Sequence, residues 1–253
     1  MSDDLVLRTE GLTKEFKGFV AVKNVDLAVK RGTIHALIGP NGAGKSTCFN
    51  LLTKFLTPSS GRIFYNGTDI TNAKPADIAR MGVARSFQIS AVFGHLTALE
   101  NVRVALQRKM GNSFHFWRAE SQLDGLNPRA EELLDSVGLG DFRYHTAVEL
   151  PYGRKRALEI ATTLALEPDV LLLDEPMAGM GQEDIARTSA LIKRVAVDRT
   201  VLMVEHNMKV VASLSDRITV LARGEVLAEG TYDEVSRNPN VVQAYMGSGA
   251  PHA

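Results

Sequence analysis

The sequence has little cysteine, no net charge and no long apolar run, and each shortage excludes a class of protein. Cys48 is the single cysteine, so no disulfide can form within the chain, and we expect a reducing compartment. Lys plus Arg and Asp plus Glu both number 29, which argues against binding nucleic acid through bulk charge. No run of 18 apolar residues is present, and the acidic start resembles no secretory signal. We expect a cytoplasmic protein whose membrane contact, if any, is peripheral.

The pattern of apolar residues predicts an α/β fold. Residues 5–38 are expected to form strands, and residues 45–57 a helix. Residues 97–165 contain helix patterns and no convincing strand, and Asn127 is expected to cap one of these helices. After residue 168 strand and helix patterns alternate again. The sequence therefore predicts an α/β core with an N-terminal antiparallel sheet and a helical insert.

A glycine-rich segment lies between an expected strand and an expected helix. Its sequence, Gly39-Pro-Asn-Gly-Ala-Gly-Lys-Ser46, matches the P-loop pattern, in which backbone N–H groups at a helix N-terminus bind phosphates. Lys45 is expected to reach the terminal phosphates, and the Ser46 hydroxyl to bind Mg²⁺. The alternative is a glycine-rich loop with a surface lysine. The predicted ATP-binding residues of this segment are Gly39, Pro40, Asn41, Gly42, Ala43, Gly44, Lys45, Ser46 and Thr47.

A second motif is an apolar strand that ends in two carboxylates. Residues 170–173 are Val-Leu-Leu-Leu, and Asp174 and Glu175 follow. An Asp at this position can bind Mg²⁺ directly or through water, and the next carboxylate can deprotonate an attacking water. The alternative is a strand end whose acids are simply solvated. Together the two motifs predict a nucleotide-hydrolysing P-loop protein.

Three further elements narrow the choice of family. Leu150-Pro-Tyr-Gly-Arg-Lys-Arg156 begins an expected helix, Phe87-Gln88 follows an expected strand, and His206 follows another. With these motifs, in this order, the chain resembles the ATP-binding cassette (ABC) transporter ATPases. The resemblance implies one cassette domain over residues 5–247, with a P-loop core, an antiparallel β-subdomain, a helical subdomain at 97–165 and a frayed tail at 248–253.

The resemblance also implies roles for particular residues. Phe16 would stack on adenine, with Phe19 as a rival. Gln88 would contact Mg²⁺ and the attacking water, His206 would contact the γ-phosphate, and Gly153 would approach the ATP bound to the other subunit. The implied catalytic residues are Lys45, Gln88, Glu175 and His206, and the implied metal ligands are Ser46, Gln88 and Asp174.

The chain departs from the family pattern at the signature helix. Pro151 replaces the usual serine, Arg154 the usual glutamine, and Gly181 the aspartate that bridges subunits. We expect Arg154 to supply charge at the partner's ATP in place of the missing hydroxyl. The alternative is a solvated basic face made of Arg154, Lys155 and Arg156.

Within the family, the chain is most similar to the larger ATPase subunit of branched-chain amino-acid importers. The marks are residues 150–153, Leu-Glu-Ile at 158–160, Ala-Gly-Met at 178–180, and the ending over 238–247. This implies a second cassette, either a copy or a paralogue, two transmembrane permease subunits and, indirectly, a periplasmic binding protein. It places the chain at the cytoplasmic face of the inner membrane, with no nucleic-acid partner.

Other readings remain open on the sequence alone. Importers of urea, amides or other amino acids share much of the pattern, and a lipopolysaccharide exporter would present a similar cassette. A non-transport ABC ATPase acting on DNA or ribosomes is disfavoured by the neutral charge and the lack of sustained heptads. A P-loop kinase would leave the signature helix and Glu175 unexplained.

Overall fold

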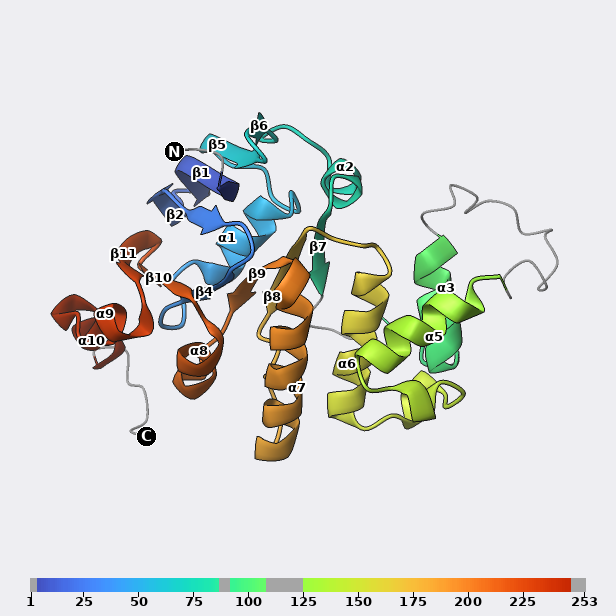
Figure 1. The fold of residues 1–253 in the computed structure, drawn as a ribbon. Helices are drawn as coiled ribbons and strands as arrows, with labels where there is room; N and C mark the ends of the chain where they lie inside the picture. Colours follow the sequence, from blue (N-terminus) through green and yellow to red (C-terminus); the bar gives the residue numbers. More distant parts are fainter. Residues whose placement is uncertain (1–3, 87–91, 108–124, 247–253) are drawn as a thin grey trace. The chain divides into compact units, whose positions relative to one another are not determined.

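The computed structural model describes residues 4–86, 92–107 and 125–246. The chain divides into two compact units. Unit 1 comprises Met1–Arg85, Asp169–Pro176 and Lys193–Ala253, and unit 2 comprises Ser86–Pro168 and Met177–Ile192. Figure 1 shows that the labelled strands lie in the first unit, whereas the second is built from helices. The predicted tail at 248–253 lies outside the described residues.

The larger sheet of unit 1 has the strand order β11-β10-β4-β9-β8-β7 (Figure 1). Strands β10, β4, β9 and β8 are parallel, and β11 pairs antiparallel with β10. Every residue of β4, β8 and β9 is buried, as in parallel strands covered on both faces. The bounds are β4 (Ile34–Ile38), β7 (Val83–Ser86), β8 (Val170–Asp174), β9 (Thr200–Val204), β10 (Arg217–Ala222) and β11 (Glu225–Gly230).

The second sheet of unit 1 is antiparallel, as the sequence predicts for residues before the P-loop. Its order is β2-β1-β5-β6, and β3 also pairs with β1. A buried cluster that includes Leu7, Leu12 and Phe49 joins this sheet to the larger one. The bounds are β1 (Leu5–Phe16), β2 (Phe19–Val25), β3 (Ala28–Lys30), β5 (Ser60–Tyr65) and β6 (Thr68–Asp69).

The helix after the P-loop is shorter than predicted. Helix α1 spans Lys45–Leu52 and does not continue to residue 57. The Thr53 hydroxyl donates to the Phe49 carbonyl at 2.8 Å, and Lys54 takes a left-handed φ of 63°, which a continuing helix does not allow. The other helices of unit 1 are α2 (Pro75–Arg80), α8 (Met208–Leu214), α9 (Tyr232–Ser236) and α10 (Pro239–Met246).

Unit 2 is helical, as predicted, in the part that the structure describes. Helices α3, α5 and α6 pack on one another, and α7 begins in the same unit. The prediction that Asn127 caps a helix is wrong, because α5 starts at Asn127 and its cap residue is Leu126, which makes no side-chain cap bond. The bounds are α3 (Ala98–Gln107), α5 (Asn127–Ser136), α6 (Tyr152–Leu164) and α7 (Gln182–Val195). No helix in the described ranges has the length and hydropathy needed to cross a bilayer.

Candidate nucleotide-binding site

The P-loop connects the carboxyl end of β4 to the first turn of α1. Gly39 has a φ of 149°, and a Cβ there would lie 2.1 Å from the Leu221 carbonyl oxygen. Gly44 has a φ of 99°, and a Cβ there would lie 2.5 Å from the Ala21 carbonyl oxygen. Both positions therefore require glycine, because neighbouring backbone fills the space of a side chain.

The turn between β10 and β11 supports the loop from one side. The Gly224 amide donates to the Ala43 carbonyl at 3.0 Å, and the Lys23 amide donates to the Gly224 carbonyl at 2.8 Å. Arg223 and Gly224 take φ values of 51° and 83°, as in a tight hairpin turn. Strand β2, this turn and the P-loop are thus joined by backbone hydrogen bonds before any ligand binds.

Lys45 is buried at the start of α1. Its Nζ donates to the carbonyl of Gly39 at 2.7 Å and to that of Pro40 at 3.0 Å. Burial lowers the pKa of Lys45, and the Glu175 and Asp174 carboxylates act in the opposite direction. The ammonium is therefore held inside the loop, where it interacts electrostatically with the carboxylates of Asp174 and Glu175 at the end of β8.

Asp174 ends β8 and is 3% exposed. Its Oδ2 accepts a hydrogen bond from Arg85 Nη2 at 2.6 Å. Arg85 Nη1 donates to Asn50 Oδ1 on α1, also at 2.6 Å. Neither Arg85 nor Asn50 belongs to a motif of the sequence, although a charged residue within the short strand β7 is a signal that a buried partner exists.

Glu175 turns the chain away from β8. Its amide donates to the Val204 carbonyl at 3.0 Å, and its φ is 44°, in the left-handed region. A non-glycine residue in this conformation costs about 1–3 kcal/mol, and such strain tends to be found at functional positions. The turn places Glu175 at the carboxyl edge of the parallel sheet, next to the end of β9.

His206 follows β9 and is exposed. The Glu205 carboxylate before it is fully buried, and its Oε2 accepts from the amides of His206 at 2.9 Å and Asn207 at 3.0 Å. Asn207 in turn caps α8 by accepting from the amides of Lys209 and Val210. Glu205, which the sequence analysis did not identify, thus fixes the backbone that carries His206.

Both aromatic candidates for adenine stacking lie at the β1–β2 hairpin. Phe16 and Phe19 are register partners, with exposed fractions of 41% and 66%. The Lys14 Nζ lies 5.2 Å from the centre of the Phe16 ring. Both side chains are exposed, so exposure does not decide between them, and the assignment of Phe16 to adenine stacking stays a prediction.

The predicted signature residues lie at the start of α6, in unit 2. A Cβ on Gly153 would lie 2.7 Å from the Asp184 carboxyl carbon. The Arg154 guanidinium carbon lies 3.6 Å from the centre of the Phe142 ring, a cation–π contact. Arg156 is buried and pairs with Glu159 at 2.5 Å, so the alternative of a solvated basic face is wrong for Arg156.

Ser46, Thr47 and Gln88 are the other predicted contacts of the site. Ser46 is exposed and Thr47 half-buried in the first turn of α1. Gln88, predicted to contact Mg²⁺ and water, lies outside the described residues.

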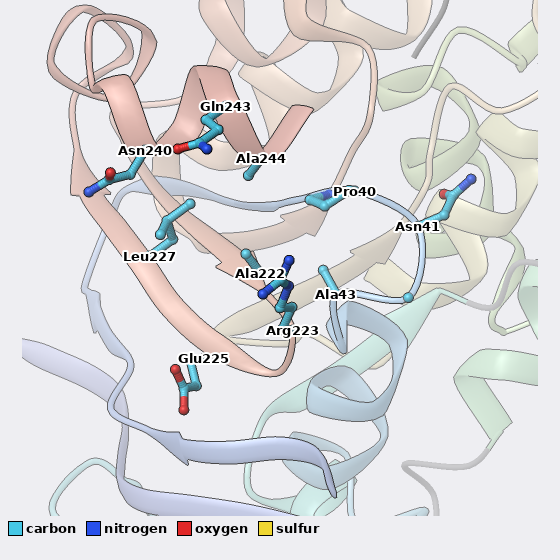
Figure 2. A pocket seen from close by; sticks show the side chains of 11 residues that line it. Pro40, Asn41, Ala43, Ala222, Arg223, Glu225, Leu227, Asn240, Gln243 and Ala244 are labelled. Atoms are coloured by element: carbon cyan, nitrogen blue, oxygen red, sulfur yellow. The ribbon is translucent and has the colours of Figure 1, made fainter. Parts of the chain in front are cut away.

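A cavity of about 610 Å³ lies beside the P-loop (Figure 2). Pro40, Asn41, Gly42 and Ala43 form one wall, the β10–β11 hairpin a second, and α10 a third. Figure 2 shows the Arg223 side chain beside Ala43 of the P-loop and Ala222 of the hairpin. Burial raises the pKa of Tyr245, on α10, to about 12, against an opposing interaction with the Gly39 backbone. Residues of the C-terminal helix and of the P-loop therefore line the same cavity.

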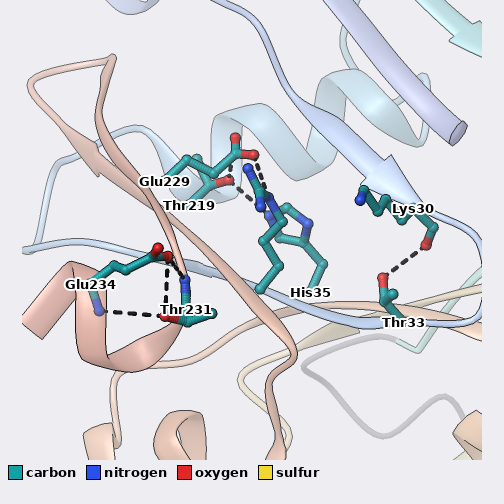
Figure 3. A network of polar contacts seen from close by, with 8 residues as sticks. Lys30, Thr33, His35, Thr219, Glu229, Thr231 and Glu234 are labelled. Carbon is teal, nitrogen blue, oxygen red and sulfur yellow. Dashed lines mark hydrogen bonds and ion pairs between the residues drawn. The ribbon is translucent and has the colours of Figure 1, made fainter. Parts of the chain in front are cut away.

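A network of polar contacts joins β4, β10 and β11, and its members His35 and Thr219 are fully buried (Figure 3). His35 on β4 has its Nε2 2.8 Å from the Thr219 hydroxyl on β10, and that hydroxyl donates to Glu229 Oε2 at 3.2 Å. Arg217 Nε donates to the other Glu229 oxygen at 2.7 Å. Burial lowers the pKa of His35 to about 4, with Glu229 raising it and Arg217 lowering it. His35 is therefore neutral at pH 7.

Comparison with known families gives this site its context. The chain matches the family model described as "ABC transporter" over residues 22–178. The chain belongs to the ABC transporter family. Residues 225–251 also match a model described as "Branched-chain amino acid ATP-binding cassette transporter", and this range includes β11 and α10 beside the P-loop.

Curated relatives and solved structures agree with this family. The chain is 39% identical to the high-affinity branched-chain amino acid transport ATP-binding protein BraF of Pseudomonas aeruginosa, over 96% of this chain and 98% of that protein. It is 38% identical to the corresponding protein LivG of Escherichia coli, with the same two shares.

Two solved structures of ABC transporter cassettes are similar to this chain. The ADP conformation of an ABC transporter cassette has a TM-score of 0.84 and 29% identity, covering 96% of this chain and 99% of that one. A dimeric cassette bound to ADP and Pi has a TM-score of 0.74 and 26% identity, covering 89% and 98%. The predicted ABC ATPase fold and the resemblance to the branched-chain amino-acid group are confirmed, and the cassette is a nucleotide-binding ATPase.

Proposed function

We propose that this cassette binds and hydrolyses ATP to drive an importer of branched-chain amino acids. The main support for ATP hydrolysis is the arrangement around Lys45. Its ammonium lies in the P-loop and interacts electrostatically with the carboxylates of Asp174 and Glu175. The names of the relatives support the cargo, since BraF and LivG are described as branched-chain amino acid transport proteins.

The residues present fit a Mg²⁺–phosphate group. The Ser46 hydroxyl and the Asp174 carboxylate are hard oxygen donors, which Mg²⁺ prefers, and Gln88 is a third proposed ligand. When bound, Mg²⁺ would neutralise charge on the phosphates. Asp174 is suited to this role because it is buried and its direction is fixed by Arg85.

The chemistry then depends on groups of this chain. Lys45 and the P-loop amides, from Gly39 to Thr47, would hold the phosphates. Glu175 would accept a proton from the attacking water, and its strained turn keeps the carboxylate at the edge of the sheet. His206 would contact the γ-phosphate from the end of β9, while Phe16 would stack on adenine.

The proposed assembly needs other chains. One signature helix and one P-loop per chain imply a second cassette, a copy or a paralogue, whose ATP would receive Gly153 and Arg154. Two permease subunits would carry the cargo, fed by a periplasmic binding protein, with this chain at the cytoplasmic face of the inner membrane. The dimeric cassette with ADP and Pi supports such pairing by analogy.

Reconstitution tests the function directly. The cassette, its permease subunits and a second cassette are placed in proteoliposomes with the binding protein, and leucine uptake is measured with and without ATP on the cassette side. We expect ATP-dependent uptake that disappears in Lys45→Ala, which lacks the ammonium. Uptake of urea or another solute in place of leucine, isoleucine and valine would overturn the cargo but not the ATPase.

A further inference from the structure

Arg85 connects three parts of unit 1 that the nucleotide site uses. It lies on β7, and its two terminal nitrogens reach Asn50 on α1 and Asp174 at the tip of β8, each at 2.6 Å. Its guanidinium carbon also lies 5.8 Å from the centre of the Phe49 ring on α1. The guanidinium therefore joins the helix that begins with Lys45 and Ser46 to the proposed metal ligand.

We infer that Arg85 is a positioning residue for the metal, acting through Asp174. The inference rests on the proposed function and adds a part of the same site. By binding Oδ2, Arg85 fixes the plane of the Asp174 carboxylate, and by binding Asn50 it fixes that plane relative to α1 and Ser46. The two proposed ligands are thereby held in one arrangement before Mg²⁺ enters.

The burial of this group makes the arrangement rigid. The side chains of Arg85 and Asp174 are 12% and 5% exposed, so solvent screens their attraction little. A planar guanidinium can hold two acceptors in fixed directions, which an ammonium cannot. Partners that orient a metal ligand commonly change metal affinity by about 10- to 100-fold when they are removed.

The chain supplies a matched control for the simple loss of a buried ion pair. Arg156 and Glu159 on α6 form a pair at 2.5 Å with exposed fractions of 7% and 6%, and both belong to unit 2. Arg156→Lys disturbs a pair of similar burial that has no proposed contact with Asp174. Because Arg156 Nη2 also donates to the Ser86 hydroxyl at 3.3 Å, next to Arg85 on β7, this variant reports how the loss of neighbouring buried contacts affects nucleotide binding while Arg85 still holds Asp174.

The experiment compares the parent, Arg85→Lys and Arg156→Lys by titrating Mg²⁺, and separately Mn²⁺, into protein with a fluorescent ATP analogue. ATP binding in EDTA and the melting temperature are measured alongside. We expect Arg85→Lys to raise the half-saturating metal concentration about ten-fold while leaving metal-free ATP affinity unchanged. Arg156→Lys should lower the melting temperature without moving the metal midpoint.

A second variant covers a folding failure of Arg85→Lys. Asn50→Ala keeps the pair between Arg85 and Asp174 but removes the hydrogen bond from the guanidinium to α1. We therefore expect the half-saturating metal concentration to rise in this variant too, but by less than in Arg85→Lys. An unchanged midpoint in Arg85→Lys, or an equal loss of metal-free binding, overturns the inference; if Arg85→Lys does not fold, an unchanged midpoint in Asn50→Ala does. A parent that binds no ATP even with metal overturns the proposed function as well.

Discussion

The P-loop region of unit 1 and the signature helix of unit 2 differ in what their side chains contact. In unit 1, Lys45 and Asp174 are buried and held by neighbours of the same site. In unit 2, Gly153 lies against Asp184, and Arg154 stacks on Phe142. The two residues that are proposed to contact a partner's ATP therefore already contact other residues of their own chain. The first region is organised before a ligand binds, whereas the second would have to exchange internal contacts for external ones.

The largest effect on ATP hydrolysis should come from replacing Glu175, the acid that follows β8. In Glu175→Gln the side chain keeps its shape but cannot accept a proton, so we expect phosphate release by the assembled transporter to fall by about 10²- to 10⁴-fold while ATP stays bound. Steady-state phosphate release measures this. Glu183→Gln, at an exposed acid paired with Arg187 in unit 2, is the control. Turnover near that of the parent would show that Glu175 is not the base.

The polar network around the buried His35 should make unit 1 sensitive to acid. The pKa of His35 is about 4 in the fold and about 6.5 in an unfolded chain, so below pH 6.5 the unfolded state binds the proton first. The stability that His35 contributes is complete above pH 6.5 and is lost as pH falls toward 4, by about 3 kcal/mol in total.

Urea unfolding of the parent and of His35→Gln between pH 7.5 and 4.5 isolates this effect from the titration of other groups. The variant can still bond to Thr219 but cannot titrate, so its stability should fall less steeply with acid. Parallel curves for the two proteins would assign the acid sensitivity elsewhere.

These two regions also show which features sequence reasoning could reach. The P-loop could be predicted because its glycines, its lysine and the start of its helix are contiguous in the sequence. The strand predicted before it and the helix predicted after it are both present. The predicted end of α1 at residue 57 is wrong because Lys54 adopts a left-handed conformation, which the pattern of residues there does not predict. Arg85 and Glu205 were missed because their partners are distant in sequence or are backbone amides. Long-range pairing of this kind is visible only once the strands are placed side by side.

A third test concerns why residue 153 is glycine. A Cβ there would crowd Asp184, although alanine is the better helix former by about 1 kcal/mol. Because the Asp184 carboxylate can turn aside, we expect Gly153→Ala to raise the melting temperature less in the parent than in an Asp184→Ala background. ATP-driven cassette pairing should weaken in both backgrounds if the partner's ATP also needs this space. Full recovery of pairing by Asp184→Ala would mean that the glycine serves only the internal contact.

The smallest effect concerns Arg154. Its cation–π contact with Phe142 is worth about 0.5–1 kcal/mol, and its position in the first turn of α6 places positive charge at the positive end of the helix dipole. A nearby phosphate would reverse that unfavourable term. We therefore expect Arg154 to leave the ring for the partner's ATP, replacing in part the hydroxyl that Pro151 lacks.

Titration of ATP-driven pairing in a Glu175→Gln background decides between the two contacts of Arg154. We expect Arg154→Ala to raise the half-saturating ATP concentration a few-fold and to weaken its dependence on salt, because one charge at the phosphate is lost. Phe142→Leu releases the guanidinium from the ring and should not raise that concentration. If both variants lower the melting temperature equally and neither moves the ATP midpoint, Arg154 serves only the packing of unit 2. In that case the signature helix must act on the partner's phosphate through its backbone alone.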